Sequence, residues 1–152
     1  FRQLVYESGG WKENLLMNQD GDFFSRILMI ASKAYFISNA KVYYRIGEYS
    51  TVSKANSENK LVSLLDSYIS YKENALIHKD NLRVRKALSY NFTYFIYLYG
   101  NKYPALYKKA KDQVENLGVG FQLRKKSPRI RFVSKILGFE NLMAIRRIIS
   151  KE

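Results

Sequence analysis

The sequence predicts a mainly α fold of the α+β class, with a short β pair followed by a helical bundle and two basic C-terminal helices. Apolar residues recur at the spacing of one-sided helices over residues 20–32 and 57–117. Aromatic and β-branched residues gather over residues 35–44. Basic residues dominate after residue 123. We therefore expect two parts, residues 1–56 and 57–152, that pack as one unit.

Composition excludes several classes of protein. The 152 residues, 47% of them hydrophobic, are enough to bury a core, which argues against disorder. The chain has no cysteine, so a disulfide framework and a thiolate metal site are excluded, and a single histidine, His78, excludes a histidine-based metal site. No apolar run approaches the roughly 20 residues of a membrane-spanning helix, and no signal peptide is visible. We expect a cytoplasmic location, and the start at Phe1 indicates a fragment of a longer protein.

Capping and stop residues predict where the first helices begin and end. Asp and Ser are frequent helix caps, Pro suits a first turn, and Gly commonly follows a last turn. The predicted helices run from Asp20 to about Ser32, from Ser57 to Leu76, from Asp80 to Gly100 and from Pro104 to Gly118.

The β pair is predicted between the first two helices. Residues 35–37 and 42–44, Tyr-Phe-Ile and Val-Tyr-Tyr, read as two short strands, and Ser38-Asn39 reads as the turn between them. Residues 45–57 are polar and are expected to form a loop.

Residues 9–26, GGWKENLLMNQDGDFFSR, carry the candidate chemistry. Asp20 stands where an apolar run becomes a helix, so it is either a helix cap that meets the helix dipole or a base that faces a cleft. Trp11, the only tryptophan, is either a packing anchor or a stacking surface beside the Gly9-Gly10 turn.

A net charge of +13 favours polyanionic neighbours. Residues 124–152 concentrate this charge on two amphipathic segments. The first begins at Ser127-Pro128, and Gly138 separates it from the second. Such helices suit an anionic membrane surface, and the alternative is a solvated face that keeps the protein soluble. Nucleic acid is not the expected partner, because the tyrosines of residues 90–103 follow helical spacing and suit a core. The basic residues of the stretch stand at positions 124, 125, 126, 129, 131, 135, 146, 147 and 151.

The order of motifs over residues 9–53 resembles the C-terminal half of the catalytic domain in family 2 glycosyltransferases, the inverting enzymes of the GT-A type. In that family a glycine-rich turn and an aromatic residue precede an acidic motif at the head of a helix. An arginine, a Tyr-Arg pair and a serine-containing loop follow. The matching residues here are Gly9, Gly10, Trp11, Gln19-Asp20, Asp22, Arg26, Tyr43-Tyr44-Arg45, Ser50 and Ser53.

The resemblance implies that Asp20 is the catalytic base that takes the proton from an acceptor sugar hydroxyl. It also implies that Gly10, Trp11, Asp22, Arg26, Tyr44, Arg45 and Ser50 contribute to substrate binding. Gln19 stands where the family usually has Glu, so the first acidic position departs from the pattern.

The same resemblance implies partners and a cofactor. A complete enzyme would use a nucleotide sugar, a glycan or lipid-linked acceptor, and a divalent metal (Mn or Mg) held by an Asp-x-Asp pair in a donor-binding half. These 152 residues lack that half, and although Asp20-Gly21-Asp22 spells Asp-x-Asp, it opens a helix, so we expect no metal here.

The expected function is therefore the acceptor-side fragment of a glycosyltransferase for lipid-linked or surface glycans, inactive alone, with a peripheral contact at the inner face of the cell membrane. The alternative is a basic helical module without chemistry that binds nucleic acid or an anionic membrane.

Overall fold

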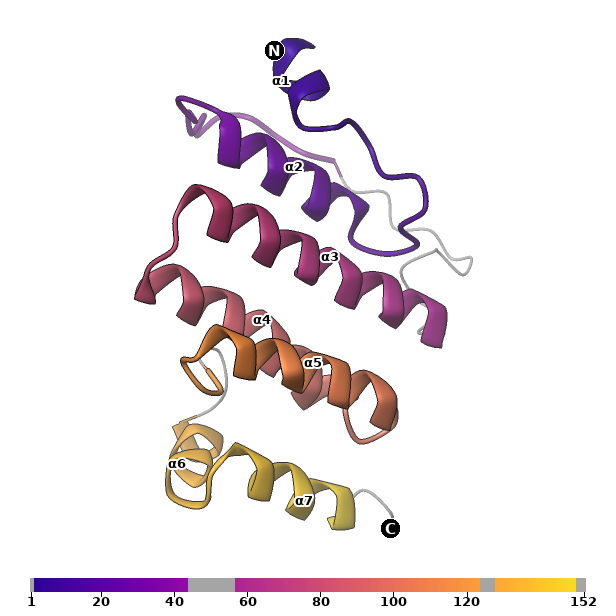
Figure 1. Ribbon diagram of the computed structural model, residues 1–152, viewed down its shortest axis with the longest axis vertical. Coiled ribbons are helices and arrows are strands. Elements are labelled where there is room, and N and C mark those ends of the chain that lie inside the picture. Colours follow the sequence, from indigo (N-terminus) through magenta and orange to yellow (C-terminus); the bar gives the residue numbers. More distant parts are fainter. Residues whose placement is uncertain (1, 44–56, 124–127, 150–152) are drawn as a thin grey trace. The chain divides into compact units, whose positions relative to one another are not determined.

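The computed structural model describes residues 2–43, 57–123 and 128–149 (Figure 1). The chain divides into two compact units, unit 1 (Phe1–Asn74) and unit 2 (Ala75–Glu152). Helix α3 runs across the division. The helices of the described residues are α1 (Arg2–Glu7), α2 (Gln19–Ile30), α3 (Glu58–His78), α4 (Leu82–Tyr99), α5 (Pro104–Leu117), α6 (Pro128–Leu137) and α7 (Phe139–Ile149).

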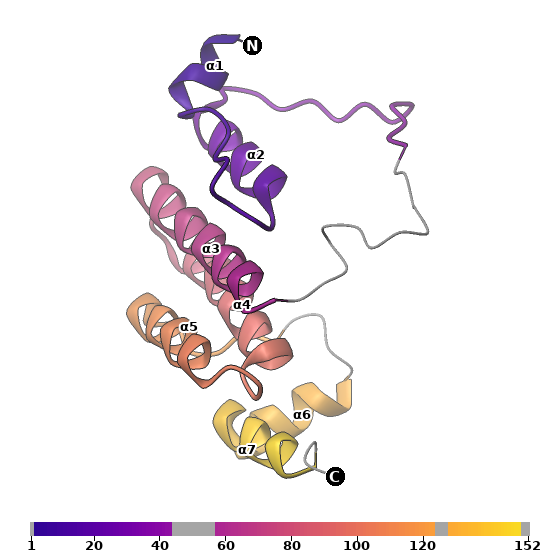
Figure 2. The ribbon, with the colours of Figure 1, turned by 90° about the vertical axis from the view of Figure 1, so that its right-hand side faces the viewer.

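The described residues form a mainly α structure, and the predicted short β pair is wrong, as is the α+β class that it implied. Residues 31–43 form irregular chain, drawn without a strand arrow in Figure 2. Only the turn at Ser38-Asn39 is present, closed by a hydrogen bond from the Ala40 N–H to the Ile37 carbonyl at 3.3 Å. Phe36 and Val42 are 92% and 93% exposed, so neither predicted strand has a surface to cover. High β propensity alone does not hold an isolated hairpin together.

Helices α2 to α7 follow the predicted pattern closely. The Ser57 hydroxyl accepts a long hydrogen bond, 3.4 Å, from the Lys60 N–H at the start of α3. Pro104 occupies the first turn of α5, and Gly118 ends the helix in the left-handed region with φ 66°. The cap of α4 is Asn81 instead of the predicted Asp80, because the Asn81 side chain accepts from the Val84 N–H at 3.0 Å. The short helix α1 was not predicted.

Unit 2 has an apolar core between α4 and α5. Phe92 and Phe95 of α4 and Ala110 and Val114 of α5 are at most 1% exposed. Among the tyrosines of residues 90–103, Tyr97 is buried and the others are partly exposed, which supports packing over base stacking.

Helix α7 joins this core through one face. Phe139 stacks on Phe121 with ring centroids 4.5 Å apart, and Glu140 pairs with Lys111 of α5 at 2.6 Å. The Arg146 guanidinium lies 3.9 Å from the Tyr97 ring centroid and donates to the Tyr97 carbonyl oxygen. Among the described residues, no helix is both long and apolar enough to span a bilayer.

Candidate functional site

The candidate site lies at the start of α2, where Asn18 precedes the helix in the left-handed region (φ 62°, ψ 32°). The Asn18 amide donates to the Ser67 Oγ at 2.8 Å and to the Tyr71 Oη at 2.6 Å, both on α3. The expectation that Asp20 is the cap is therefore wrong, since Asn18 holds that position and Asp20 lies in the first turn. Contacts with α3 hold Asn18 in this conformation, and the local sequence does not reveal them.

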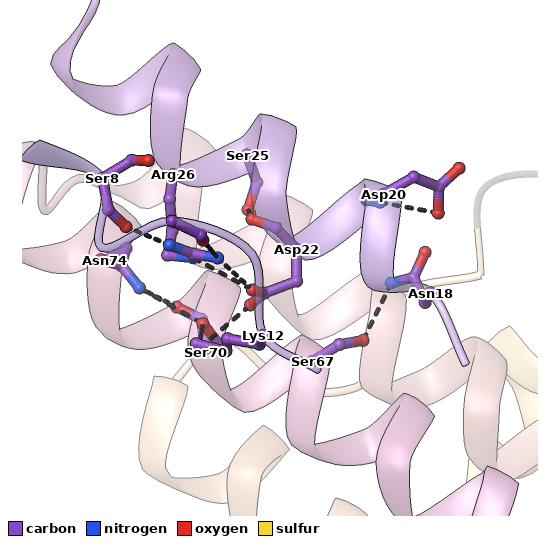
Figure 3. Close-up of polar contacts among 12 residues, drawn as sticks. Ser8, Lys12, Asn18, Asp20, Asp22, Ser25, Arg26, Ser67, Ser70 and Asn74 are labelled. Atoms are coloured by element: carbon purple, nitrogen blue, oxygen red, sulfur yellow. Dashed lines mark hydrogen bonds and ion pairs between the residues drawn. The ribbon is translucent and has the colours of Figure 1, made fainter. Parts of the chain in front are cut away.

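Asp22 is the buried carboxylate of the pair (Figure 3). Its Oδ2 accepts from the Arg26 Nε at 3.0 Å, and its Oδ1 lies 3.3 Å from the Lys12 Nζ. Burial acts to raise the pKa of Asp22, but hydrogen bonds from Ser70 and Arg26 and the charges of Lys12 and Arg26 outweigh it, so the pKa is lowered. Asp22 is therefore an ionised, fully partnered group.

Arg26 connects this carboxylate to the glycine turn. Its Nη2 donates to the Gly10 carbonyl oxygen at 2.7 Å, and its Nη1 donates to the Ser8 carbonyl oxygen. Gly9 and Gly10 have φ values of 77° and 68°, which favour glycine at both positions. The positive φ values allow the turn to present its carbonyl groups to the guanidinium. The structure thus brings together three of the predicted site residues, Gly10, Asp22 and Arg26.

Asp20 is the exposed carboxylate of the pair. Its Oδ1 accepts from the Gly21 N–H at 2.9 Å, and in Figure 3 its side chain points away from Asp22. It stands in the first turn of a helix, where the dipole stabilises a negative charge by about 0.3–1 kcal/mol. Asp20 is therefore accessible to a ligand from solvent.

Trp11 forms an aromatic contact beside this turn. Its ring centroid lies 5.1 Å from that of Phe23, and the residue is 47% exposed. Packing on Phe23 fixes one side of the ring and leaves surface on which a ligand could stack. The other predicted substrate-binding residues, Tyr44, Arg45 and Ser50, lie outside the described residues.

A row of small polar side chains on α3 anchors the segment before α2, and sequence analysis missed it. Ser63, Ser67 and Ser70 are all buried and lie on one helix face. Ser63 accepts from the Leu16 N–H at 2.7 Å, Ser67 from Asn18, and Ser70 from the Lys12 Nζ at 2.9 Å. The spacing of four and three residues that puts these serines on one face of α3 was the available signal.

The two aspartates do not fit a divalent metal. Asp22 faces two cationic side chains, Arg26 and Lys12, which would repel a metal ion at its oxygens. Within residues 2–43, 57–123 and 128–149, no group of three or more His, Asp or Glu side chains could hold a metal. Any metal of a complete enzyme would need other ligands.

Unit 1 also contains an open pocket of about 320 Å³ between the segment before α2 and the start of α3. This volume lies near the lower end of the range for small-molecule sites. Neither Asp20 nor Trp11 lines it. Its lining residues are Lys12, Asn14, Leu15, Leu16, Asn59, Val62, Ser63 and Asp66.

Comparison of the chain with protein-family models, curated proteins and solved structures gave no match.

Proposed function

We propose that this chain is the acceptor-side part of an inverting glycosyltransferase and that Asp20 is its general base. The observation that carries the proposal is the difference in burial and ion pairing between the two aspartates. Asp22 is buried and neutralised by Arg26 and Lys12, whereas Asp20 is exposed at the head of the same helix. Of these two aspartates, Asp20 is the one exposed to a hydroxyl group of a substrate.

The reaction follows from that placement. The Asp20 carboxylate takes the proton of an acceptor sugar hydroxyl while the hydroxyl oxygen forms a bond to the anomeric carbon of a nucleotide sugar. The bond from that carbon to the diphosphate oxygen breaks, and the diphosphate leaves with the electron pair. General-base assistance of this kind contributes about 10²- to 10⁴-fold in rate.

Anchoring on α3 supports this role. A base must keep its position to within a fraction of an ångström, and elements held by packing and hydrogen bonds achieve this better than loose loops. The Asn18 contacts with Ser67 and Tyr71 fix the start of α2, and Arg26 fixes the preceding turn. The donor nucleotide and any Mg or Mn ion belong, in this proposal, to a donor-binding half outside these 152 residues.

The test is release of nucleoside diphosphate from a panel of UDP-hexoses, with lipid-linked saccharides as acceptors, by the natural protein that contains this chain. Asp20→Asn is expected to lower the rate by about 10²- to 10⁴-fold without changing the circular dichroism spectrum. Glu13→Gln, at an exposed carboxylate in the same unit, is the matched control and is expected to keep full activity.

Two results would overturn the proposal. Full activity in the Asp20→Asn protein would remove Asp20 from the chemistry. Transfer by the 152-residue chain alone would show that donor binding is contained in it, contrary to an acceptor-side role.

A further inference from the structure

Two short helices of unit 2, α6 and α7, carry apolar side chains that no part of the described structure covers. On α6, Phe132 and Ile136 are each 64% exposed and lie one turn apart. On α7, Ile148 and Ile149 are 72% and 66% exposed. We call the exposed side chains Phe132, Ile136, Ile145, Ile148 and Ile149 the apolar face.

Helix α7 exposes apolar side chains both opposite the face that packs on the rest of unit 2 and at the C-terminal end of that face. Phe139, Leu142 and Met143 are buried on one side of the helix. Ile148 lies on the opposite side of the helix, whereas Ile145 and Ile149 extend the stripe of Leu142 to the end of the helix, where they are 40% and 66% exposed. Helix α7 is thus apolar on two sides, and unit 2 buries only one of them.

Both helices are also basic. Lys135, which precedes Ile136 in α6, and Arg147, which precedes Ile148 in α7, are both exposed. The sequence of α6 and α7 contains Arg129, Arg131, Lys135, Arg146 and Arg147, against the single acidic residue Glu140, which is already paired with Lys111. Arg146 packs on Tyr97, so the exposed described cations of the two helices are Lys135 and Arg147, each next in sequence to an exposed isoleucine.

We propose that the apolar face of α6 and α7 docks on an anionic lipid bilayer. Burial in an apolar phase would stabilise the exposed isoleucines, and contact with anions would stabilise the exposed lysine and arginine. The interface of an acidic bilayer offers acyl chains and anionic headgroups next to each other. Nucleic acid would satisfy only the charges. A second copy of the chain would cover the isoleucines but would bring like charge against like charge.

The lengths of the helices decide how they would bind. Helices α6 and α7 have 10 and 11 residues, so each is about 15–17 Å long at about 1.5 Å per residue. A bilayer core is about 30 Å thick, so both helices would lie in the plane of the interface. Gly138, with φ 80°, makes the turn between them, and the two helices leave it in different directions: Figure 1 shows α6 almost end-on and α7 from the side, and Figure 2 shows the reverse.

The test is co-sedimentation of the 152-residue chain with sucrose-loaded vesicles of phosphatidylcholine alone or with 30% phosphatidylglycerol. We expect binding to the anionic vesicles only, weakened by raising the salt concentration from 0.1 to 0.5 M. Phe132→Ser with Ile148→Ser is expected to reduce the partition coefficient at least tenfold, and Lys135→Gln with Arg147→Gln is expected to flatten the salt dependence.

The matched control is Ile77→Ser with Lys79→Gln, which removes an 81% exposed isoleucine and a nearby lysine at the end of α3. It is expected to bind vesicles as the unaltered chain does. Unchanged thermal unfolding of each variant shows that the fold is intact.

Equal binding by the Phe132→Ser, Ile148→Ser variant would overturn the proposal, as would absence of binding to anionic vesicles. Sedimentation velocity without lipid provides a further test: an unaltered chain that is dimeric and a variant that is monomeric would assign the apolar face to a second copy. The assay needs neither sugar donor nor acceptor, so its outcome is independent of the proposed transferase.

Discussion

Arg26 and Asp22 form a buried ion pair within one turn of α2, with the Arg26 Nε 3.0 Å from the Asp22 Oδ2 and both residues at most 7% exposed. The same guanidinium also donates to the Gly10 carbonyl oxygen at 2.7 Å. One arginine therefore satisfies a buried charge and a turn carbonyl together. The glycine turn and the start of α2 are consequently held as one piece, with Asp20 on its outer side.

Replacing Arg26 by Met is expected to destabilise unit 1 by about 3–5 kcal/mol, because Lys12 is then the one cation left beside the buried Asp22 carboxylate. The double change Asp22→Leu, Arg26→Met is expected to recover part of the loss, since it removes both charges but still leaves the turn carbonyls unpaired. Urea unfolding followed by the fluorescence of Trp11, the only tryptophan, measures both. Arg2→Met, at an exposed arginine, is the control, and a similar loss there would contradict the assignment.

The lowered pKa of Asp22 predicts a loss of stability in acid. Because the pKa in the folded protein lies below the ordinary value of 3.8, the folded state holds this carboxylate ionised more strongly than the unfolded state does. The contribution is fully present above the unfolded value and is lost as the pH falls through the folded value. We expect the free energy of unfolding to decline below about pH 4.

Comparison with Asp22→Asn isolates this group. The variant is expected to be less stable at neutral pH and to lose less on acidification than the unaltered chain. The pKa of Asp80 is also lowered, by its hydrogen bond to Arg85, so Asp80→Asn gives the contribution of an exposed pair in the same pH range. A parallel decline in the Asp22→Asn and unaltered proteins would show that the acid sensitivity arises elsewhere.

The helices could be predicted from the sequence because their signals are local. Apolar spacing locates the body of each helix, and Pro104 and Gly118 mark the two ends of α5 through backbone constraints that need no distant partner. The prediction of the β pair was wrong because strand formation depends on contacts that are not local. Tyr35, Phe36 and Val42 have strand propensity, but a strand also needs a partner and a surface to cover, and neither is visible in the sequence.

The candidate site was predicted only in part, for the same reason. Gly10, Asp22 and Arg26 were predicted as site residues and do lie together, but the ion pair between Asp22 and Arg26 was not predicted. The burial of that pair, and with it the contrast between Asp22 and the exposed Asp20, depends on α3, whose contacts with this segment include pairs 49 and 58 positions apart, Asn18–Ser67 and Lys12–Ser70. Contacts at such separation leave no periodic signal.

The cap of α4 offers a test in unit 2. Asn81→Ala removes the acceptor of the Val84 N–H and is expected to cost about 0.5–2 kcal/mol, typical of a lost cap. Asp80→Ala is expected to cost less, since its ion pair with Arg85 is exposed and screened by solvent. Thermal unfolding followed by circular dichroism distinguishes the two. A larger loss of stability for Asp80→Ala than for Asn81→Ala would show that Asp80 is the cap, as the sequence predicted.

At Gly21, between the two aspartates, helix propensity and side-chain packing predict opposite effects of a change to alanine. Alanine in the interior of a helix is favoured over glycine by about 1 kcal/mol, so local preference predicts that Gly21→Ala stabilises α2. A Cβ at this position, however, would lie 2.3 Å from both the Asn18 Oδ1 and the Tyr71 Oη. We expect the contact to prevail and unit 1 to lose about 1–3 kcal/mol, as in other overpacked sites.

Adding Tyr71→Phe to Gly21→Ala removes the hydroxyl from one of these two close contacts, so the double variant should be more stable than the sum of the single changes predicts. Urea unfolding of the two single variants and the double variant, monitored by Trp11 fluorescence, gives this coupling. If Gly21→Ala raised the urea midpoint, α3 would not approach the start of α2 this closely, and the anchoring of Asp20 through Asn18 and Tyr71 would be wrong.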